Sequence, residues 1–225
     1  MKILAVDTAL GALSVALVAD GRTVAHDWRE MVRGHAEALA PMVEAVMRQG
    51  ETSFAALDRL AVTTGPGTFT GQRVGLAFMR ALALALKKPL IGVTTLDAMA
   101  EDALNRNASA GWAVAAADAK RGEVYLGARN RTGGILAPML VPLEEAAARI
   151  AELADDQGRT LLLAGTATEL LIPLLAARGL QPTDSAVRQP DARAVSRLAL
   201  HAPIGPVPKP LYLRAPDAKL PGTPA

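Results

Sequence analysis

The chain has 225 residues, of which 51% are hydrophobic but only 3% aromatic, and its formal net charge is +2 at pH 7. This length allows one large or two small domains, and so small a charge gives no electrostatic reason for the chain to bind nucleic acid alone. The chain has no cysteine, which excludes disulfides, thiol catalysis and zinc–thiolate sites. His26, His35 and His201 show no metal-ligand spacing, so we expect no metal site.

The first part of the chain is predicted to form three strands joined by turns. Apolar segments separated by turn residues occupy positions 3–7, 14–18 and 23–28. The apolar run before residue 20 is similar to a signal peptide, but Asp7 and Gly11 interrupt it, and an aspartate is costly in such a leader. We therefore expect a cytoplasmic protein whose first strand ends at Asp7.

A helix is expected over residues 35–48, with Leu39 in its apolar stripe. Pro41 lies inside this pattern, where it either kinks the helix or marks its first turn. An apolar strand at residues 60–64 then leads into a glycine-rich turn.

The turn at residues 65–75, Gly-Pro-Gly-Thr-Phe-Thr-Gly-Gln-Arg-Val-Gly, is the most informative motif. Such a turn between strand and helix often brings backbone N–H groups to an anion, but no Gly-Lys-Ser/Thr follows, which excludes a Walker-type phosphate loop. The alternative is a tight turn that lets the helix pack closely on its own sheet, with Thr68 or Thr70 capping it. The residues that could approach a nucleotide are Gly65, Pro66, Gly67, Thr68, Thr70 and Gly71.

The following helix, residues 71–86, carries only two charges, Arg73 and Arg80. One apolar stripe is suited to packing on a sheet, and the other apolar residues have no reason to face water. The helix is too short and too charged to span a membrane. Either one side meets the core and the other meets a partner, or the helix is buried wholly inside one domain.

The second half of the chain repeats this layout. Three strands are predicted at 112–118, 123–128 and 135–136, followed by a helix, a strand and a helix at 143–154, 160–164 and 168–177. The pattern predicts an α/β fold in which a βββαβα unit is used twice, with a cleft between two lobes. We place the N-terminal lobe at residues 1–102 and the smaller C-terminal lobe at 103–225.

The C-terminal segment is rich in proline, with seven of the chain's 15 prolines after residue 202. Proline disfavours helix, so residues 206–214 are expected to form an extended arm. The apolar residues Leu211, Tyr212 and Leu213 should pack it on the body, whereas residues 220–225 should fray.

Asp7 and Asp118 end corresponding strands of the two halves and are expected on opposite walls of the cleft, with Thr8 and Arg121 beside them. In two-lobed ATPases of the actin and sugar-kinase type, such carboxylates handle Mg²⁺ and phosphates. Phosphate-binding turns of that type commonly read Asp-x-Gly, and neither turn here has that glycine. The aspartates either cap their own turns or serve a stand-alone ATP-dependent kinase or transferase. No nucleophile–base pair is recognisable, so we expect no catalytic residue.

Several segments together resemble the TsaB (YeaZ) family, which belongs to the bacterial system that makes threonylcarbamoyladenosine in tRNA. The matching segments are residues 3–9, 33–37, 65–75, 118–125 and 210–214. They span almost the whole chain, and the glycine-rich run is the most specific of them. Ala9 stands where serine is frequent in the family.

The resemblance implies an actin-like, ribonuclease-H-like fold in a non-catalytic scaffold subunit. Such a subunit binds and activates the threonylcarbamoyltransferase TsaD, which modifies position 37 of ANN-decoding tRNAs. It further implies that the ATPase TsaE joins the complex, that ATP is used by the complex and is no cofactor of this chain, and that tRNA is contacted only through the complex. The isolated chain should form a homodimer and should not associate with membranes.

The resemblance also implies that two helices of the N-terminal lobe pack against equivalent helices of TsaD. The expected interface residues are Leu39, Arg73, Leu76, Ala77, Arg80, Ala83 and Leu84.

Overall fold

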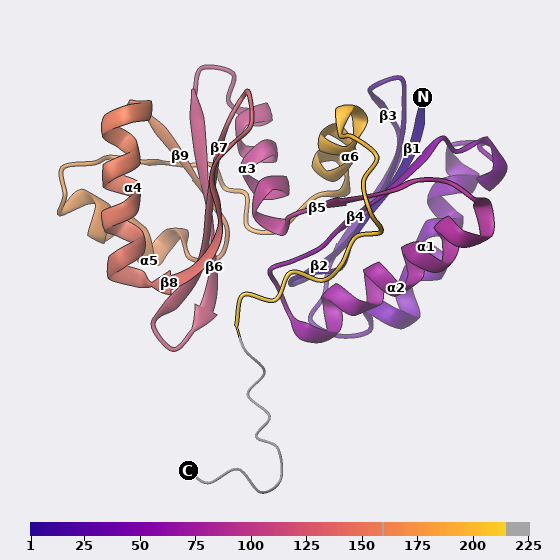
Figure 1. Cartoon of the computed structure of the whole chain (residues 1–225), viewed down its shortest axis with the longest axis horizontal. Coiled ribbons are helices and arrows are strands. Elements are labelled where there is room, and N and C mark those ends of the chain that lie inside the picture. The colour runs from indigo at the N-terminus through magenta and orange to yellow at the C-terminus, as the bar shows by residue number, and fades with distance from the viewer. Residues whose placement is uncertain (159, 215–225) are drawn as a thin grey trace, which may run out of the picture.

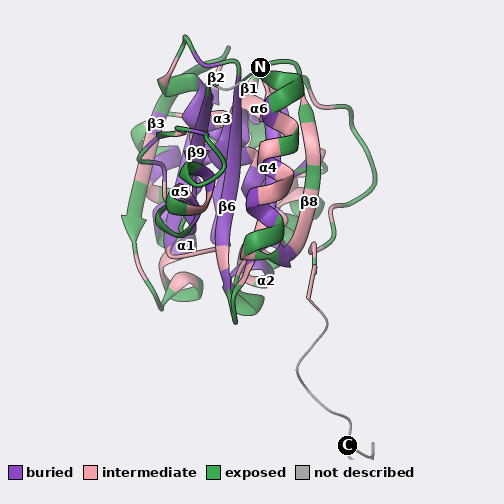
Figure 2. Ribbon diagram, turned by 90° about the vertical axis from the view of Figure 1, so that its left-hand side faces the viewer, coloured by how far each residue is buried: buried purple, intermediate pink, exposed green. Residues whose placement is uncertain are grey.

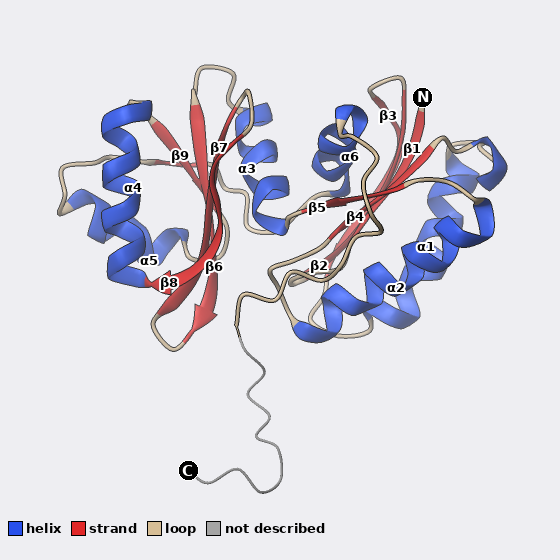
Figure 3. Ribbon diagram, viewed as in Figure 1, coloured by secondary structure: helices blue, strands red, loops and turns tan. Residues whose placement is uncertain are grey.

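The computed structural model describes residues 1–158 and 160–214, so the fraying expected at 220–225 lies outside the described residues. These residues form two lobes, each built on a five-stranded sheet with helices on both faces (Figures 1 and 3). The expected α/β fold with a duplicated βββαβα unit is confirmed. Each sheet also contains a fifth strand that the sequence analysis missed.

The sheet of the first lobe has the strand order β3-β2-β1-β4-β5. The β1 strand is antiparallel to β2 and parallel to β4, so β1 and β4 end at the same edge of the sheet. The strands are β1 (Lys2–Asp7), β2 (Ala12–Ala19), β3 (Arg22–Glu30), β4 (Arg59–Thr63) and β5 (Leu90–Val93).

Two helices, α1 (His35–Gln49) and α2 (Phe69–Leu86), cover one face of this sheet, and a short 3₁₀ turn, η1 (Phe54–Ala56), precedes β4 (Figure 1). Their inner sides pack on side chains that alternate along the strands, such as Leu4 and Val6 of β1. The α1 helix continues through Pro41, so this proline does not mark its first turn.

The second sheet has the order β10-β9-β6-β7-β8, with α4 (Leu143–Gln157) and α5 (Thr168–Ala176) on one face. Alternate residues of β6 serve the two faces, so that Trp112 packs toward α4 and Ala113 toward α3 (Thr95–Arg106). The strands are β6 (Trp112–Lys120), β7 (Glu123–Asn130), β8 (Gly134–Pro142), β9 (Leu161–Ala164) and β10 (Thr183–Asp184).

The lobes exchange helices near the middle of the molecule. The α3 helix follows the first lobe but packs on the second sheet, and α6 (Ala192–His201) returns from the second lobe to the first sheet. The predicted boundary after residue 102 therefore falls inside α3. Figure 2 shows that the central strands are buried, whereas the outward sides of the helices are exposed.

Candidate functional site

The glycine-rich segment 65–75 joins β4 to α2 and packs against the turn that follows β1. A Cβ atom at Gly67 would lie 2.3 Å from the carbonyl oxygen of Ala9, and one at Gly71 would lie 2.2 Å from that of Thr8. A side chain at either position would overlap the backbone, so this close approach requires glycine.

Hydrogen bonds hold α2 to this turn. The Thr8 hydroxyl donates to the carbonyl of Gly71 at 2.7 Å and accepts from the amide of Gly75 at 3.0 Å. The Thr68 amide donates to the carbonyl of Ala9 at 2.8 Å, and the Thr68 hydroxyl caps α2. These bonds favour the interpretation of the motif as a tight turn that packs the helix on its sheet, and contact with a nucleotide stays a prediction.

A cavity of about 420 Å³ lies beside the motif, between the first turns of α1 and α2. Arg33, His35 and Thr70 are among the residues that line it. The Nε2 atom of His35 is buried without a hydrogen-bond partner. Space for a small molecule therefore remains next to the segment, even though several of its N–H groups are bonded internally.

The outer sides of α1 and α2 form a surface, which we call the outer face, on which small and apolar side chains lie among two acidic residues of α1 and two basic residues of α2. Leu84 is 81% exposed there, beside exposed Ala77 and Ala81 of the same helix. No other described part of the chain buries this side of α2, which excludes a helix enclosed within one domain. The outer face comprises Glu37, Ala40, Pro41 and Glu44 of α1 and Arg73, Ala77, Arg80, Ala81 and Leu84 of α2.

Not all of the expected interface residues lie on the outer face. Leu39 and Leu76 are only 1% and 2% exposed and belong to the core beneath it, so they cannot make direct contact with a partner. Ala83 is half-buried against the same core. Ala81 was not among the expected interface residues, although its spacing of four residues from Ala77 places both on one side of the helix.

Arg73 forms a hydrogen bond with Tyr212 of the C-terminal arm, a contact that the sequence did not predict. The Nε atom of Arg73 donates to the Tyr212 hydroxyl at 2.8 Å, and its guanidinium lies 3.4 Å from the centre of the Phe69 ring. Phe69 and Tyr212 stack with ring centres 5.6 Å apart. The expected packing of the arm on the body is confirmed, and it fixes the orientation of Arg73.

Asp7 is completely buried where β1 and β4 end side by side. Its Oδ1 accepts hydrogen bonds from the Thr63 hydroxyl at 2.5 Å and from the Ala9 amide at 3.2 Å, whereas its Oδ2 has no partner. Burial raises the pKa of Asp7 to about 6, although the two hydrogen bonds oppose the rise. A carboxylate enclosed in this way is not placed to bind a metal–phosphate group from solvent.

The other expected cleft residues do not join Asp7 in one site. Thr8 is 1% exposed and holds α2. Asp118 lies half-buried near the end of β6 in the second lobe, where a hydrogen bond from Lys120 lowers its pKa. Arg121 is exposed in the turn that follows β6. The interpretation of the aspartates as residues that stabilise their own turns is therefore favoured, since both accept an amide N–H from two residues further on.

Residues 29–169 match the family described as TsaD: tRNA N6-adenosine threonylcarbamoyltransferase. YeaZ from Pseudomonas aeruginosa has 30% sequence identity and superposes with a TM-score of 0.75, covering 88% of this chain and 90% of that one. The chain belongs to the TsaB (YeaZ) family. The tRNA threonylcarbamoyladenosine biosynthesis protein TsaB of Escherichia coli is 44% identical over 56% of this chain and 53% of its own. The chain thus aligns with about half the length of that relative.

A more distant structural likeness supports the fold alone. The ROK hexokinase from Thermus thermophilus superposes with a TM-score of 0.54 at 12% identity, covering 90% of this chain and all of that one. The expected two-lobed, actin-like fold is therefore confirmed for this TsaB-family chain.

Ser14, His26 and Asp191 lie close together but do not form a nucleophilic triad. The Nε2 atom of His26 is 3.4 Å from the Ser14 hydroxyl oxygen and 3.2 Å from Oδ1 of Asp191. Serine and carboxylate thus contact the same ring nitrogen, whereas a triad needs them on opposite nitrogens. The Ser14 hydroxyl instead accepts the amide of Ala192, so these residues position α6 against β2.

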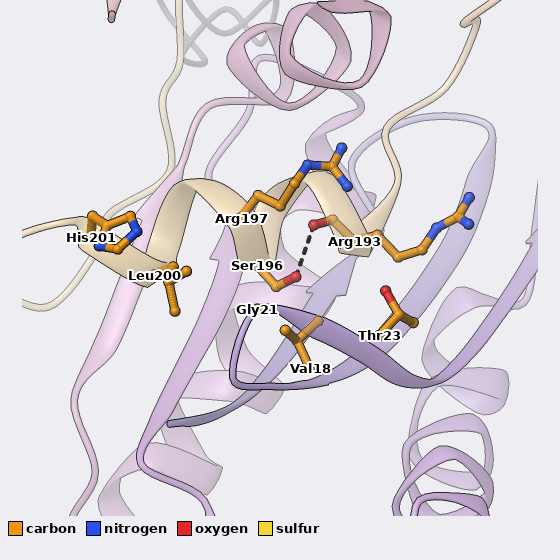
Figure 4. Close-up of a pocket in the computed structure, with 8 residues that line it drawn as sticks. All are labelled: Val18, Gly21, Thr23, Arg193, Ser196, Arg197, Leu200 and His201. Atoms are coloured by element: carbon orange, nitrogen blue, oxygen red, sulfur yellow. Dashed lines mark hydrogen bonds between the residues drawn. The ribbon is translucent and has the colours of Figure 1, made fainter. Parts of the chain in front are cut away.

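A cavity of about 330 Å³ lies between α6 and the β2–β3 turn (Figure 4). Arg193 and Arg197 line it, but each is paired with a carboxylate, Arg193 with Asp191 at 2.7 Å and Arg197 with Asp102 at 3.3 Å. Because both guanidinium charges are compensated, the cavity has little attraction for an anion. Across the described residues there is no cluster of metal-ligating side chains, and no helix there is long and apolar enough to cross a bilayer.

Replacing Gly71 by alanine should destabilise this TsaB-family chain, because the added methyl group must displace the backbone of Thr8. We expect the free energy of unfolding to fall by about 2 kcal/mol in urea denaturation. Gly111→Ala is the matched control, since a Cβ there meets no atom within 4 Å. Equal unfolding midpoints for the two variants would contradict the close packing.

The raised pKa of Asp7 predicts that the chain loses stability relative to Asp7→Asn as the pH rises from 4 to 7. Between pH 4 and 6 Asp7 keeps its proton in the folded chain but has released it in the unfolded chain. The stabilisation that Asp7 contributes is therefore complete below pH 4 and is lost as the pH passes 6. A change in pKa from 3.8 to about 6 corresponds to about 3 kcal/mol.

The measurement is the free energy of unfolding against pH for the wild type, Asp7→Asn and Glu152→Gln, which alters an exposed carboxylate of the second lobe. The Glu152→Gln curve should run parallel to that of the wild type. Parallel curves for the wild type and Asp7→Asn would contradict the prediction.

Proposed function

We propose that the chain is a non-catalytic scaffold subunit that binds and activates TsaD in the synthesis of threonylcarbamoyladenosine at position 37 of ANN-decoding tRNAs. The observation that carries the proposal is the outer face, an apolar surface of two helices that the described chain leaves uncovered. Relatives of this chain are named as tRNA threonylcarbamoyladenosine biosynthesis proteins, and the family that matches residues 29–169 is described as a tRNA threonylcarbamoyltransferase.

The composition of the outer face fits packing against another pair of helices. Ala77 and Ala81 present little bulk, which allows a second helix to approach closely. Leu84 supplies an apolar side chain that a partner would remove from water. Acidic Glu37 and Glu44 on α1 and basic Arg80 on α2 give the surface a charge pattern that would fix the orientation of a partner.

The remaining parts of the proposal follow from the family. TsaE joins the assembly in the cytoplasm, and tRNA is contacted only through the complex. The complex uses ATP, which is not a cofactor of this chain. If a nucleotide lies at the interface, the cavity beside residues 65–71 is the space available for it, with Arg33 and Thr70 in its wall.

The alternative of a stand-alone ATP-dependent kinase or transferase gains no support from the geometry. It depends on Asp7 and Asp118, and the first is buried while the second is paired with Lys120. Isothermal titration of the isolated chain with Mg·ATP tests this alternative, which requires tight binding.

Ala77→Trp should abolish binding to the cognate TsaD, because the indole would hold the facing helix away from the outer face. The sequence alone favours Ala83→Trp, but Ala83 is half-buried, so a tryptophan there would also disturb the core. Binding is measured by titration calorimetry, with circular dichroism as a check on folding.

The matched control is Ala176→Trp, at an exposed position of α5 in the second lobe. It should bind TsaD with the affinity of the wild type. Wild-type affinity in Ala77→Trp would refute the outer face as the docking surface.

The isolated chain should form a homodimer through the outer face, because an uncovered apolar surface seeks burial in the absence of its partner. Sedimentation equilibrium should show a dimer for the wild type and a monomer for Ala77→Trp. A wild-type monomer at high concentration would contradict this expectation.

A further inference from the structure

The described part of the C-terminal arm runs from the end of α6 along the edge of the first sheet. It passes β5, where a Cβ at Gly92 would lie 2.8 Å from Cβ of Pro208. Further on, the amide of Leu211 donates to the carbonyl of Thr64 at 2.8 Å. These contacts fix the path of the arm beside β4 and β5 (Figure 1).

The arm next contacts the first turns of α2. Tyr212 accepts the hydrogen bond from Arg73 and stacks on Phe69. Stacking and a charge-assisted hydrogen bond hold the long Arg73 side chain in one position. The arm thereby joins one end of the outer face without covering Ala77, Arg80 or Leu84.

Two residues later the arm reaches the second lobe. The Nη1 atom of Arg214 donates to the carbonyl of Ala119 at 2.7 Å, and its Nη2 pairs with the carboxylate of Glu123. Both partners lie at the β6–β7 turn. The side chains of Arg214 and Glu123 are 24% and 34% exposed, so the pair is partly shielded from solvent.

The lobes are otherwise joined around α3 and α6. Arg197 of α6 lies 3.3 Å from Asp102 and 3.5 Å from Glu101 of α3, and the Gly11 amide bonds to Gln189 at 2.9 Å. The attachment of Arg214 at the β6–β7 turn lies apart from these contacts, and a second point of attachment limits rotation of one lobe against the other.

We propose that residues 208–214 form a strap that fixes the second lobe relative to the outer face. The second part of this inference rests on the proposed function: binding of a helical partner at the outer face and the orientation of the second lobe are coupled through Arg73, Tyr212 and Arg214. Any movement of Arg73 on binding acts on Tyr212, and only Leu213 separates Tyr212 from Arg214.

The orientation of the lobes is measurable in the isolated chain, because the sequence has no cysteine. Ser53→Cys in the first lobe and Glu152→Cys on α4 provide two exposed sites for spin labels. Labelled chain is diluted with unlabelled chain so that pulsed electron resonance reports distances within one molecule. The wild-type background should give one narrow distance distribution.

Arg214→Ala should broaden this distribution, because it removes the attachment to the second lobe. Arg178→Ala is the matched control. Arg178 also pairs with a glutamate, Glu144, at 3.0 Å and donates to the carbonyl of Leu174 at 2.9 Å, but both contacts lie within the second lobe. If Arg214→Ala does not fold, Glu123→Gln weakens the same pair with little change of shape. A distribution as narrow as that of the control overturns the strap.

The coupling is tested by titrating TsaD into the unlabelled variants. Arg214→Ala should weaken binding about fivefold, at the lower end of typical coupling between sites, whereas Arg178→Ala should bind as the wild type does. Equal affinities for the two variants overturn the coupling. Failure of every chain to bind, wild type included, refutes the proposed function, and the distance measurement then decides whether the strap exists.

Discussion

The packing of α2 against the turn after β1 is the constraint on which the rest of the structure depends. Thr8 bonds to the backbone at Gly71 and Gly75, and the glycines bring helix and turn into backbone contact. The inner side of α2 is thereby fixed on the sheet, and its outer side must face away from the chain's own core. The exposed stripe on α2, whose only charges are Arg73 and Arg80, is a consequence of this placement combined with the sequence of the helix.

Asp7 is enclosed on the face of the first sheet opposite α2. It shares its side of β1 with Ile3 and Ala5, which pack with residues of α6, and burial raises its pKa. Asp118 pairs with Lys120 at the end of its own strand, which lowers the pKa of Asp118. The two strand-end aspartates therefore do not form one site, and the chain presents instead a surface suited to binding, as the proposed scaffold role requires.

The lobes are joined by exchange of elements as well as by continuity of the chain. The α3 helix packs on the second sheet, α6 packs on the first, and Arg197 links the two helices. The arm adds contacts to both lobes, so the end of α2 that carries Phe69 and Arg73 lies at a junction of three segments distant in sequence. The arm thus connects one end of the outer face to the second lobe.

The sequence by itself determined the repeated strands and helices, the tight turn and the low charge of α2, because periodicity, turn residues and capping are local properties. It held an unused signal for α3, since Thr94 and Asp97 are spaced as a helix cap and form one. Helical periodicity already placed Leu39 in the apolar stripe that forms the core. Only the tertiary structure decided that Leu76 is core, that Asp7 is enclosed, and that Arg73 bonds to Tyr212. Those outcomes depend on contacts between distant residues, 67 positions apart for Thr8 and Gly75 and 139 for Arg73 and Tyr212, and no local pattern encodes which distant segments meet.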